Sequence, residues 1–82
     1  MEKEIGKITH IFDKIDVGIL ELNGDLKVGD TIHIVGSQSD FEQLVDSMQV
    51  DRQNIVDAGK GSVVGLKLIS KAKVGDKIYL KN

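Results

Sequence analysis

The side chains that could do chemistry in this chain are few, and they are scattered along 82 residues. The chain has no cysteine, which excludes disulfides, thiolate nucleophiles and cysteine-ligated zinc or iron–sulfur sites. Its two histidines, His10 and His33, lie far apart in the sequence and lack the i, i+4 spacing of a helical metal pair. The sequence therefore predicts no metal site and no cofactor.

Acidic residues form two close pairs, Asp13 with Asp16 and Asp25 with Asp30. Both pairs fall in segments whose composition predicts loops and turns. No nucleophile in the chain has a recognisable base beside it. We therefore expect that the chain is not an enzyme, and we assign it no catalytic residue.

One glycine-rich run could in principle bind phosphate. Gly59 and Gly61 flank Lys60, and successive backbone N–H groups in such a run can form an anion-binding nest. The run does not fit the Gly-x-x-x-x-Gly-Lys-Ser/Thr pattern of a nucleotide-binding loop, and turn geometry explains its glycines. We therefore expect that this chain binds no GTP.

The elements that must position these residues are organised around a repeated stretch, Leu26–Val35 and Ala72–Lys81. Each copy contains a Lys-Val-Gly-Asp turn, in which glycine can adopt a positive φ and aspartate can accept a hydrogen bond from a neighbouring backbone N–H. Apolar residues then alternate with polar ones. Each copy therefore predicts a turn followed by a strand, at Thr31–Val35 and at Lys77–Lys81.

Three further segments read as strands, residues 4–12, 17–22 and 62–69. In the first, His10 lies between Ile8 and Phe12 on their face, which predicts a partly buried, hydrogen-bonded histidine. Short strands, nine glycines and frequent turn signals together predict a small antiparallel barrel or sandwich. Closing a barrel would remove the exposed edges of so small a sheet.

The segment 41–50 is ambiguous. Its apolar residues follow a helical spacing of i, i+3, i+4 and i+7, at Phe41, Leu44, Val45 and Met48. Ser39 with Glu42 also fits a capping box, so periodicity favours a helix. A strand is the competing interpretation, with Leu44, Met48 and Val50 on one face and Val45 on the other, beside Gln43 and Gln49.

Composition bounds the class of protein. Hydrophobic residues make up 40% of the chain and charged residues 29%, a balance that predicts one globular domain over residues 1–82. Eleven basic residues against thirteen acidic ones give a net charge of −2, which is unfavourable for binding nucleic acid through phosphates. The sequence has no signal peptide and no apolar run long enough to span a membrane, so we expect a cytoplasmic protein without membrane contact.

The order of several short motifs resembles the second domain of the translational GTPases, such as elongation factor Tu. The motifs that carry the resemblance are Gly6-Lys7-Ile8, Val17–Leu22, Leu26–Gly36, Ser47-Met48-Gln49, Ala58–Leu66 and Val74-Gly75-Asp76. Together they extend from Gly6 to Leu80. The resemblance implies an all-β fold, a small closed antiparallel six-stranded β-barrel. It also favours a strand over a helix for Glu42 to Val50.

The same resemblance implies a function. It suggests a non-catalytic translation-factor-like module that binds tRNA or ribosomal RNA, with Lys14, Arg52 and Lys60 as candidate RNA contacts. The alternative is a protein-interaction barrel that docks onto a separate protein partner without nucleic acid, which the net negative charge favours. Such a docking face should expose apolar residues, with Ile11 and Ile15 as candidates.

Overall fold

The computed structural model describes residues 2–81, and within that range the chain forms ten β-strands and no helix. The strands are β1 (Lys3–Phe12), β2 (Val17–Leu22), β3 (Leu26–Lys27), β4 (Thr31–Val35), β5 (Asp40–Leu44), β6 (Met48–Val50), β7 (Gln53–Ile55), β8 (Asp57–Ala58), β9 (Val63–Lys67) and β10 (Lys77–Lys81). The predicted all-β class is confirmed. The predicted strands at 17–22, 31–35 and 77–81 have the bounds that the sequence indicated.

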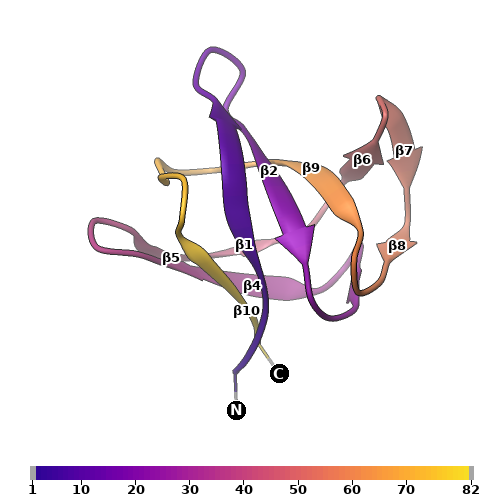
Figure 1. The fold of residues 1–82 in the computed structure, drawn as a ribbon, viewed down its shortest axis with the longest axis horizontal. Coiled ribbons are helices and arrows are strands. Elements are labelled where there is room, and N and C mark those ends of the chain that lie inside the picture. The colour runs from indigo at the N-terminus through magenta and orange to yellow at the C-terminus, as the bar shows by residue number, and fades with distance from the viewer. Residues whose placement is uncertain (1, 82) are drawn as a thin grey trace.

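Eight of the strands form one antiparallel sheet in the order β5-β4-β10-β1-β2-β9-β6-β7, and β3 pairs with β8 in a second, two-stranded sheet. Figure 1 shows β1 and β2 as a long hairpin at the centre, with β4, β5 and β10 on one side and β6 to β9 on the other. The edge strands β5 and β7 do not pair with each other. The predicted closed six-stranded barrel is therefore wrong, because the sheet is open and has more strands.

The open sheet follows from how the ambiguous segment 41–50 folds. The segment is extended, so the helical alternative is excluded, but the strand expected from Glu42 to Val50 is broken. β5 ends at Leu44 and pairs with β4, whereas β6 begins at Met48 and pairs with β7 and β9. Val45, between the two strands, is fully buried, and Leu44 is 56% exposed. Phe41, Val45 and Met48 thus reach the core from two short strands and the connection between them, and this arrangement mimics a helical spacing.

A side chain joins the two parts of the sheet where ladder pairing stops. The amide nitrogen of Gln43 donates to the carbonyl oxygen of Lys67 at 2.8 Å, and the amide oxygen of Gln43 accepts from the backbone N–H of Ile69 at 3.0 Å. Gln43 is only 5% exposed, so both polar ends of its amide are satisfied inside the protein. We call this pair of hydrogen bonds the Gln43 clasp.

The core contains one set of buried apolar side chains from seven of the ten strands and from the segments that follow β5 and β9. Its members are Ile5, Ile8, Leu20, Leu22, Leu26, Ile32, Ile34, Val45, Met48, Val64, Leu66, Leu68 and Ile78. In β2 and β4 these residues are two apart, as the alternating pattern predicted.

The first strand departs from simple alternation. Its register against β2 shifts between Ile8, which pairs with Leu20, and His10, which pairs with Ile19. Such a β-bulge inserts an extra residue and reverses the faces that follow it. As a result Ile8 is buried, but Phe12 is 46% exposed rather than in the core.

Both Lys-Val-Gly-Asp turns form as predicted. Gly29 and Gly75 have φ values of 101° and 96°, which a glycine adopts without steric cost. The carboxylate of Asp30 accepts from the backbone N–H of Lys27 at 3.0 Å, and the carboxylate of Asp76 accepts from that of Lys73 at 2.8 Å.

Candidate functional site

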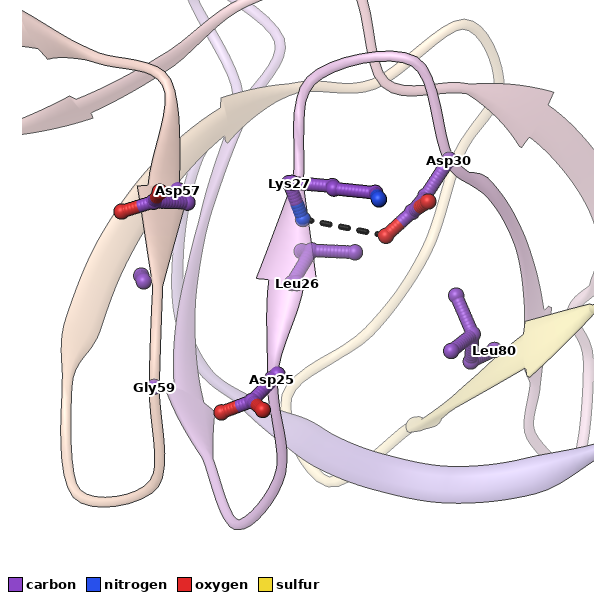
Figure 2. A pocket seen from close by; sticks show the side chains of 8 residues that line it. Asp25, Leu26, Lys27, Asp30, Asp57, Gly59 and Leu80 are labelled. Atoms are coloured by element: carbon purple, nitrogen blue, oxygen red, sulfur yellow. Dashed lines mark hydrogen bonds between the residues drawn. The ribbon is translucent and has the colours of Figure 1, made fainter.

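Three surface features could carry function: an acidic hollow, an apolar groove and a charged cluster. The acidic hollow lies against the first Lys-Val-Gly-Asp turn and has a volume of about 670 Å³. Figure 2 shows Asp25, Asp30 and Asp57 around it, with Leu26 between them and Leu80 farther to the right. The pairing of β3 with β8 places Lys27 opposite Asp57. The hollow thus combines three carboxylates with an apolar floor.

The acidic hollow lacks the hydroxyl–imidazole pair of a serine or threonine hydrolase. Its lining contains no histidine, serine or threonine. Asp30 also uses one oxygen to accept from the backbone N–H of Lys27, which is the turn role that the sequence predicted. The three carboxylates can attract a cationic group.

The apolar groove has a volume of about 430 Å³, is lined by residues of β2, β6 and β9, and reaches the β1–β2 turn at Ile15. Its lining includes Phe12, Ile15, Val17, Ile19 and Val63. Phe12, Ile15 and Val63 are 46%, 59% and 51% exposed. Exposed apolar side chains that line one groove make it a candidate surface for contact with a partner.

Backbone strain gathers around this groove. Asp16, Asp51 and Arg52 all have positive φ, at 55°, 51° and 66°, although none is glycine. This left-handed conformation costs an ordinary residue about 1–2 kcal/mol. Asp51 and Arg52 are the two central residues of the β6–β7 hairpin, where the favoured two-residue turn requires positive φ at both positions. The turn therefore holds Arg52 at the edge of the groove.

The three predicted RNA-contact residues do not form one patch. Lys14 lies in the β1–β2 turn between Phe12 and Ile15, and Arg52 lines the apolar groove, so these two share one end of the molecule. Lys60 lies in the β8–β9 turn, where the N–H of Gly61 donates to the carbonyl of Leu22 at the opposite end of β2. All three side chains are exposed.

Of the two residues expected to form an exposed apolar docking face, only one is exposed. Ile15 is exposed and lines the apolar groove, whereas Ile11 is half-buried and packs against the core. His10, expected to be partly buried, is instead exposed. Its ring meets the ring of Phe12 edge-on, with 4.5 Å between centroids. The β1 bulge explains both corrections, because it changes which side chains face inward.

The charged cluster surrounds His33 on the outer face of β4. Nδ1 of His33 lies 2.8 and 2.9 Å from the two carboxylate oxygens of Glu2, and Nε2 bonds to Asp40. Glu42, directly opposite His33 in the β4–β5 register, has one oxygen in the same group. The hydrogen bonds from Asp40 and then Glu2 raise the pKa of His33 above its ordinary value of 6.5, because both carboxylates favour the imidazolium.

Sequence reasoning missed this cluster, because its members come from three strands or strand ends that are distant in the sequence. Alternation did place His33 on the face opposite Ile32 and Ile34. The signal that could have found its partners is the alternation of Asp40 and Glu42 in the next strand, which puts both carboxylates on one face. That signal was hidden by the competing helical periodicity.

Comparison with known proteins gives one curated relative and a close structural match. The chain is 41% identical over 78 residues to an uncharacterized protease of Methanocaldococcus jannaschii, a match that covers 94% of this chain and 19% of the relative. The chain therefore spans about a fifth of that protein's length. No family model matches the sequence.

The solved structures most relevant to the fold come from a Geobacillus thermoleovorans protein described as a U32 peptidase. The crystal structure of its C-terminal domain superposes with a TM-score of 0.91, at 12% identity, over 98% of this chain and 93% of that chain. A selenomethionine variant of the same domain gives a TM-score of 0.87 at 13% identity, over 93% of this chain and 96% of that chain. These matches establish the fold.

The expected kinship with translational GTPases is thereby corrected. The curated relative is named a protease, and the structures that match over nearly the whole chain are peptidase C-terminal domains. The shared motifs were chiefly glycine–acid turns and short strands, which many small β-folds need for the same steric reasons. The translation-factor function is therefore wrong, whereas these matches do not test docking onto a protein partner. No helix in residues 2–81 is long and apolar enough to cross a membrane.

Proposed function

We propose that this chain is a non-catalytic accessory domain of a U32-type peptidase. The observation that carries the proposal is the extent of the matches. Nearly the whole chain aligns with a small part of a protease, and its fold coincides with a peptidase domain that was crystallised by itself. A unit of this kind contributes binding or placement, while another part of the peptidase performs the hydrolysis.

The site geometry supports a role without covalent chemistry. The acidic hollow contains carboxylates and one lysine but not the hydroxyl–imidazole pair of a serine or threonine hydrolase. The apolar groove exposes Phe12, Ile15 and Val63 to solvent. We infer that the groove packs against the catalytic portion of the peptidase, because burying these side chains there would remove an apolar patch from water.

The first experiment separates catalysis from assistance. Hydrolysis of an unfolded protein substrate is measured for the full-length Methanocaldococcus relative, for the same protein without its matching 78 residues, and for this chain alone. We expect no hydrolysis by this chain and at least a tenfold loss of kcat/KM in the shortened relative. Hydrolysis by this chain, or full activity in the shortened relative, would contradict the proposal.

The second experiment tests the groove. Ile15→Asp and Val63→Asp each place a charge in the apolar groove, whereas the control Val56→Asp changes a side chain that is 73% exposed and outside it. Binding of each variant to the shortened relative is measured by calorimetry. We expect the two groove variants to lose at least tenfold in affinity and the control to keep the parent value. Equal affinities for all three variants would exclude the groove as the docking surface.

A further inference from the structure

A second site, independent of the peptidase assignment, lies on the outer face of β4. The ligand atoms of Glu2, His33 and Glu42 all lie within 4.8 Å of one another. They reach this point from the approach to β1, from β4 and from β5, so the sheet brings them together although 31 residues separate Glu2 from His33. This arrangement provides one imidazole nitrogen and two carboxylates on one surface.

A cation can reach Nδ1 of His33 by replacing a proton. Asp40 and Glu2 are both carboxylates that only accept hydrogen bonds, so in the metal-free protein they favour a ring protonated on both nitrogens. When a metal ion displaces the proton on Nδ1, Asp40 keeps the proton on Nε2, and the lone pair of Nδ1 faces the carboxylate of Glu2 at 2.8 Å. Two lone pairs repel at that separation unless a proton or a metal ion lies between them. The cluster therefore has a place for positive charge.

The surrounding residues fit a metal ion. Histidines that ligate metals usually donate their second N–H to a carboxylate, and Asp40 occupies that position for His33. In a tetrahedral zinc site, ligand atoms at about 2.1 Å from the ion lie about 3.4 Å apart. Glu2 and Glu42 are exposed and need to move only slightly from their present positions.

We propose that Glu2, His33 and Glu42 bind a first-row divalent transition-metal ion of the Zn²⁺ type. A nitrogen ligand with two carboxylates favours such ions over Mg²⁺ and Ca²⁺, which prefer oxygen alone. The two glutamates neutralise the charge of the ion, and the fourth position remains open to water. The sequence predicted no metal site because the partners of His33 are not its sequence neighbours.

Lys81 gives the proposal a distinctive test. Its amine bonds to both oxygens of Glu42, at 2.7 and 2.9 Å, so it competes with the ion for that ligand. Removing this amine should free Glu42 and increase the affinity for the ion. A role of the cluster in stability alone would predict no such gain, because loss of a surface ion pair adds no ligand.

The experiment titrates Zn²⁺ into the untagged 82-residue chain by calorimetry, with circular dichroism to confirm that each variant folds. We expect one ion per chain. His33→Asn should abolish saturable binding, Asp40→Asn should weaken it by about 10–100-fold, and Lys81→Met should strengthen it severalfold. His10→Asn, which changes the other histidine, should leave the affinity within twofold of the parent.

A measurement on the unmodified chain provides a second readout. Nitrogen NMR of the imidazole rings should show Nδ1 of His33 shifting on addition of Zn²⁺, with the His10 signals unchanged. No saturable binding at millimolar Zn²⁺ would overturn the proposal. So would equal loss of affinity in His10→Asn and His33→Asn, weaker binding in Lys81→Met, or an NMR shift confined to His10.

Discussion

The two Lys-Val-Gly-Asp turns have the same backbone but different surroundings. In the first turn, the N–H of Gly29 donates to the carbonyl of Val45, and the N–H of Val45 donates to the carbonyl of Asp30, both at 2.8 Å. In the second turn, the N–H of Gly75 donates to the carbonyl of Ile8, and the N–H of Ile8 donates to the carbonyl of Asp76, again at 2.8 Å. Each turn is thus pinned by one core residue of a neighbouring segment. Sequence and backbone alone would give the two turns the same role.

Their strands are also related. β4 and β10 pair directly, with Ile34 opposite Ile78 and His33 opposite Tyr79, so the two copies lie side by side in opposite directions. The apolar positions of both copies enter the same core. Their outward positions differ, because His33 meets three carboxylates and has become a candidate ligand.

The difference between the turns lies in what covers the aspartate. Asp76 is 5% exposed, and a Cβ added to Gly36 would lie 1.9 Å from its Oδ1, so the backbone at Gly36 closes over it. Asp30 instead lines the acidic hollow of about 670 Å³. One copy of the motif is therefore sealed and structural, while the other is open to a ligand.

The largest expected effect comes from disturbing the close contact between the Gly36 backbone and the Asp76 carboxylate. Gly36→Ala should destabilise the protein by about 3 kcal/mol, because the added methyl group overlaps the Asp76 carboxylate and neither group can move freely. Urea unfolding measures this. The control Gly59→Ala, whose Cβ would lie 3.2 Å from the exposed carboxylate of Asp25, should change stability by less than about 0.5 kcal/mol. Similar losses of stability in both variants would show that the contact with Asp76 does not require glycine at position 36.

The next effect compares the two aspartates directly. Asp76→Ala removes a buried acceptor and leaves the N–H of Lys73 without its partner, which should cost about 2 kcal/mol. Asp30→Ala leaves the N–H of Lys27 accessible to water and should cost about 1 kcal/mol or less. Thermal and urea unfolding measure the difference in stability between the two variants. An equal loss would contradict the contrast between sealed and open turns.

Replacing Gly29 or Gly75 by alanine should reduce stability to the same extent. Gly29→Ala and Gly75→Ala each force alanine into positive φ, and a Cβ at either position would meet nothing within 4 Å. We expect each variant to lose about 1 kcal/mol from backbone strain alone, and to the same extent. The measurement is urea unfolding of both variants. If their free energies of unfolding differed by more than about 1 kcal/mol, the two turns would not be equally strained.

The smallest effect concerns the outward-facing His33 and the pH dependence that it gives to stability. The protein is kept free of metal by a chelator. Glu2, Asp40, Glu42 and Lys81 are the charged groups around His33, and the pKa of His33 is raised in the folded state. The folded protein therefore binds this proton more tightly than the unfolded chain. The resulting stability is fully present below pH 6.5 and is lost as the pH rises through the folded pKa.

His33→Tyr gives the first copy the residue of the second and should remove this pH dependence. The measurement is the melting temperature of parent and variant between pH 5 and 8. His10→Gln serves as the control and should retain the parent's profile. A variant His33→Tyr that kept the same profile would show that another group produces the pH dependence.

The predictability of the fold differs between regions for physical reasons. β2, β4 and β10 could be located from the sequence, because period-two alternation is bounded there by clear turn residues. The β1 bulge was missed, since an inserted residue leaves no signal in an alternation that continues past it. The break at Val45 was missed because the helical periodicity and the family resemblance each predicted one continuous element there, whereas Val45 is a buried residue between two strands.

The candidate sites were less predictable than the strands. Arg52 lines the apolar groove, but the groove depends on side chains from the β1–β2 hairpin, the β6–β7 hairpin and β9, which are distant in the sequence. The cluster at His33 depends on strand order, and β4 lies between β5 and β10 for reasons that involve the whole sheet. Local patterns specify faces and turns, whereas sites require knowledge of which faces become neighbours.

The Gln43 clasp has a consequence for mutation. Because one side-chain amide, and no backbone ladder, joins β5 to residues 67–69, Gln43→Ala would remove both hydrogen bonds and leave every strand pairing in place. The carbonyl of Lys67 and the N–H of Ile69, on either side of the buried Leu68, would then lose their side-chain partner.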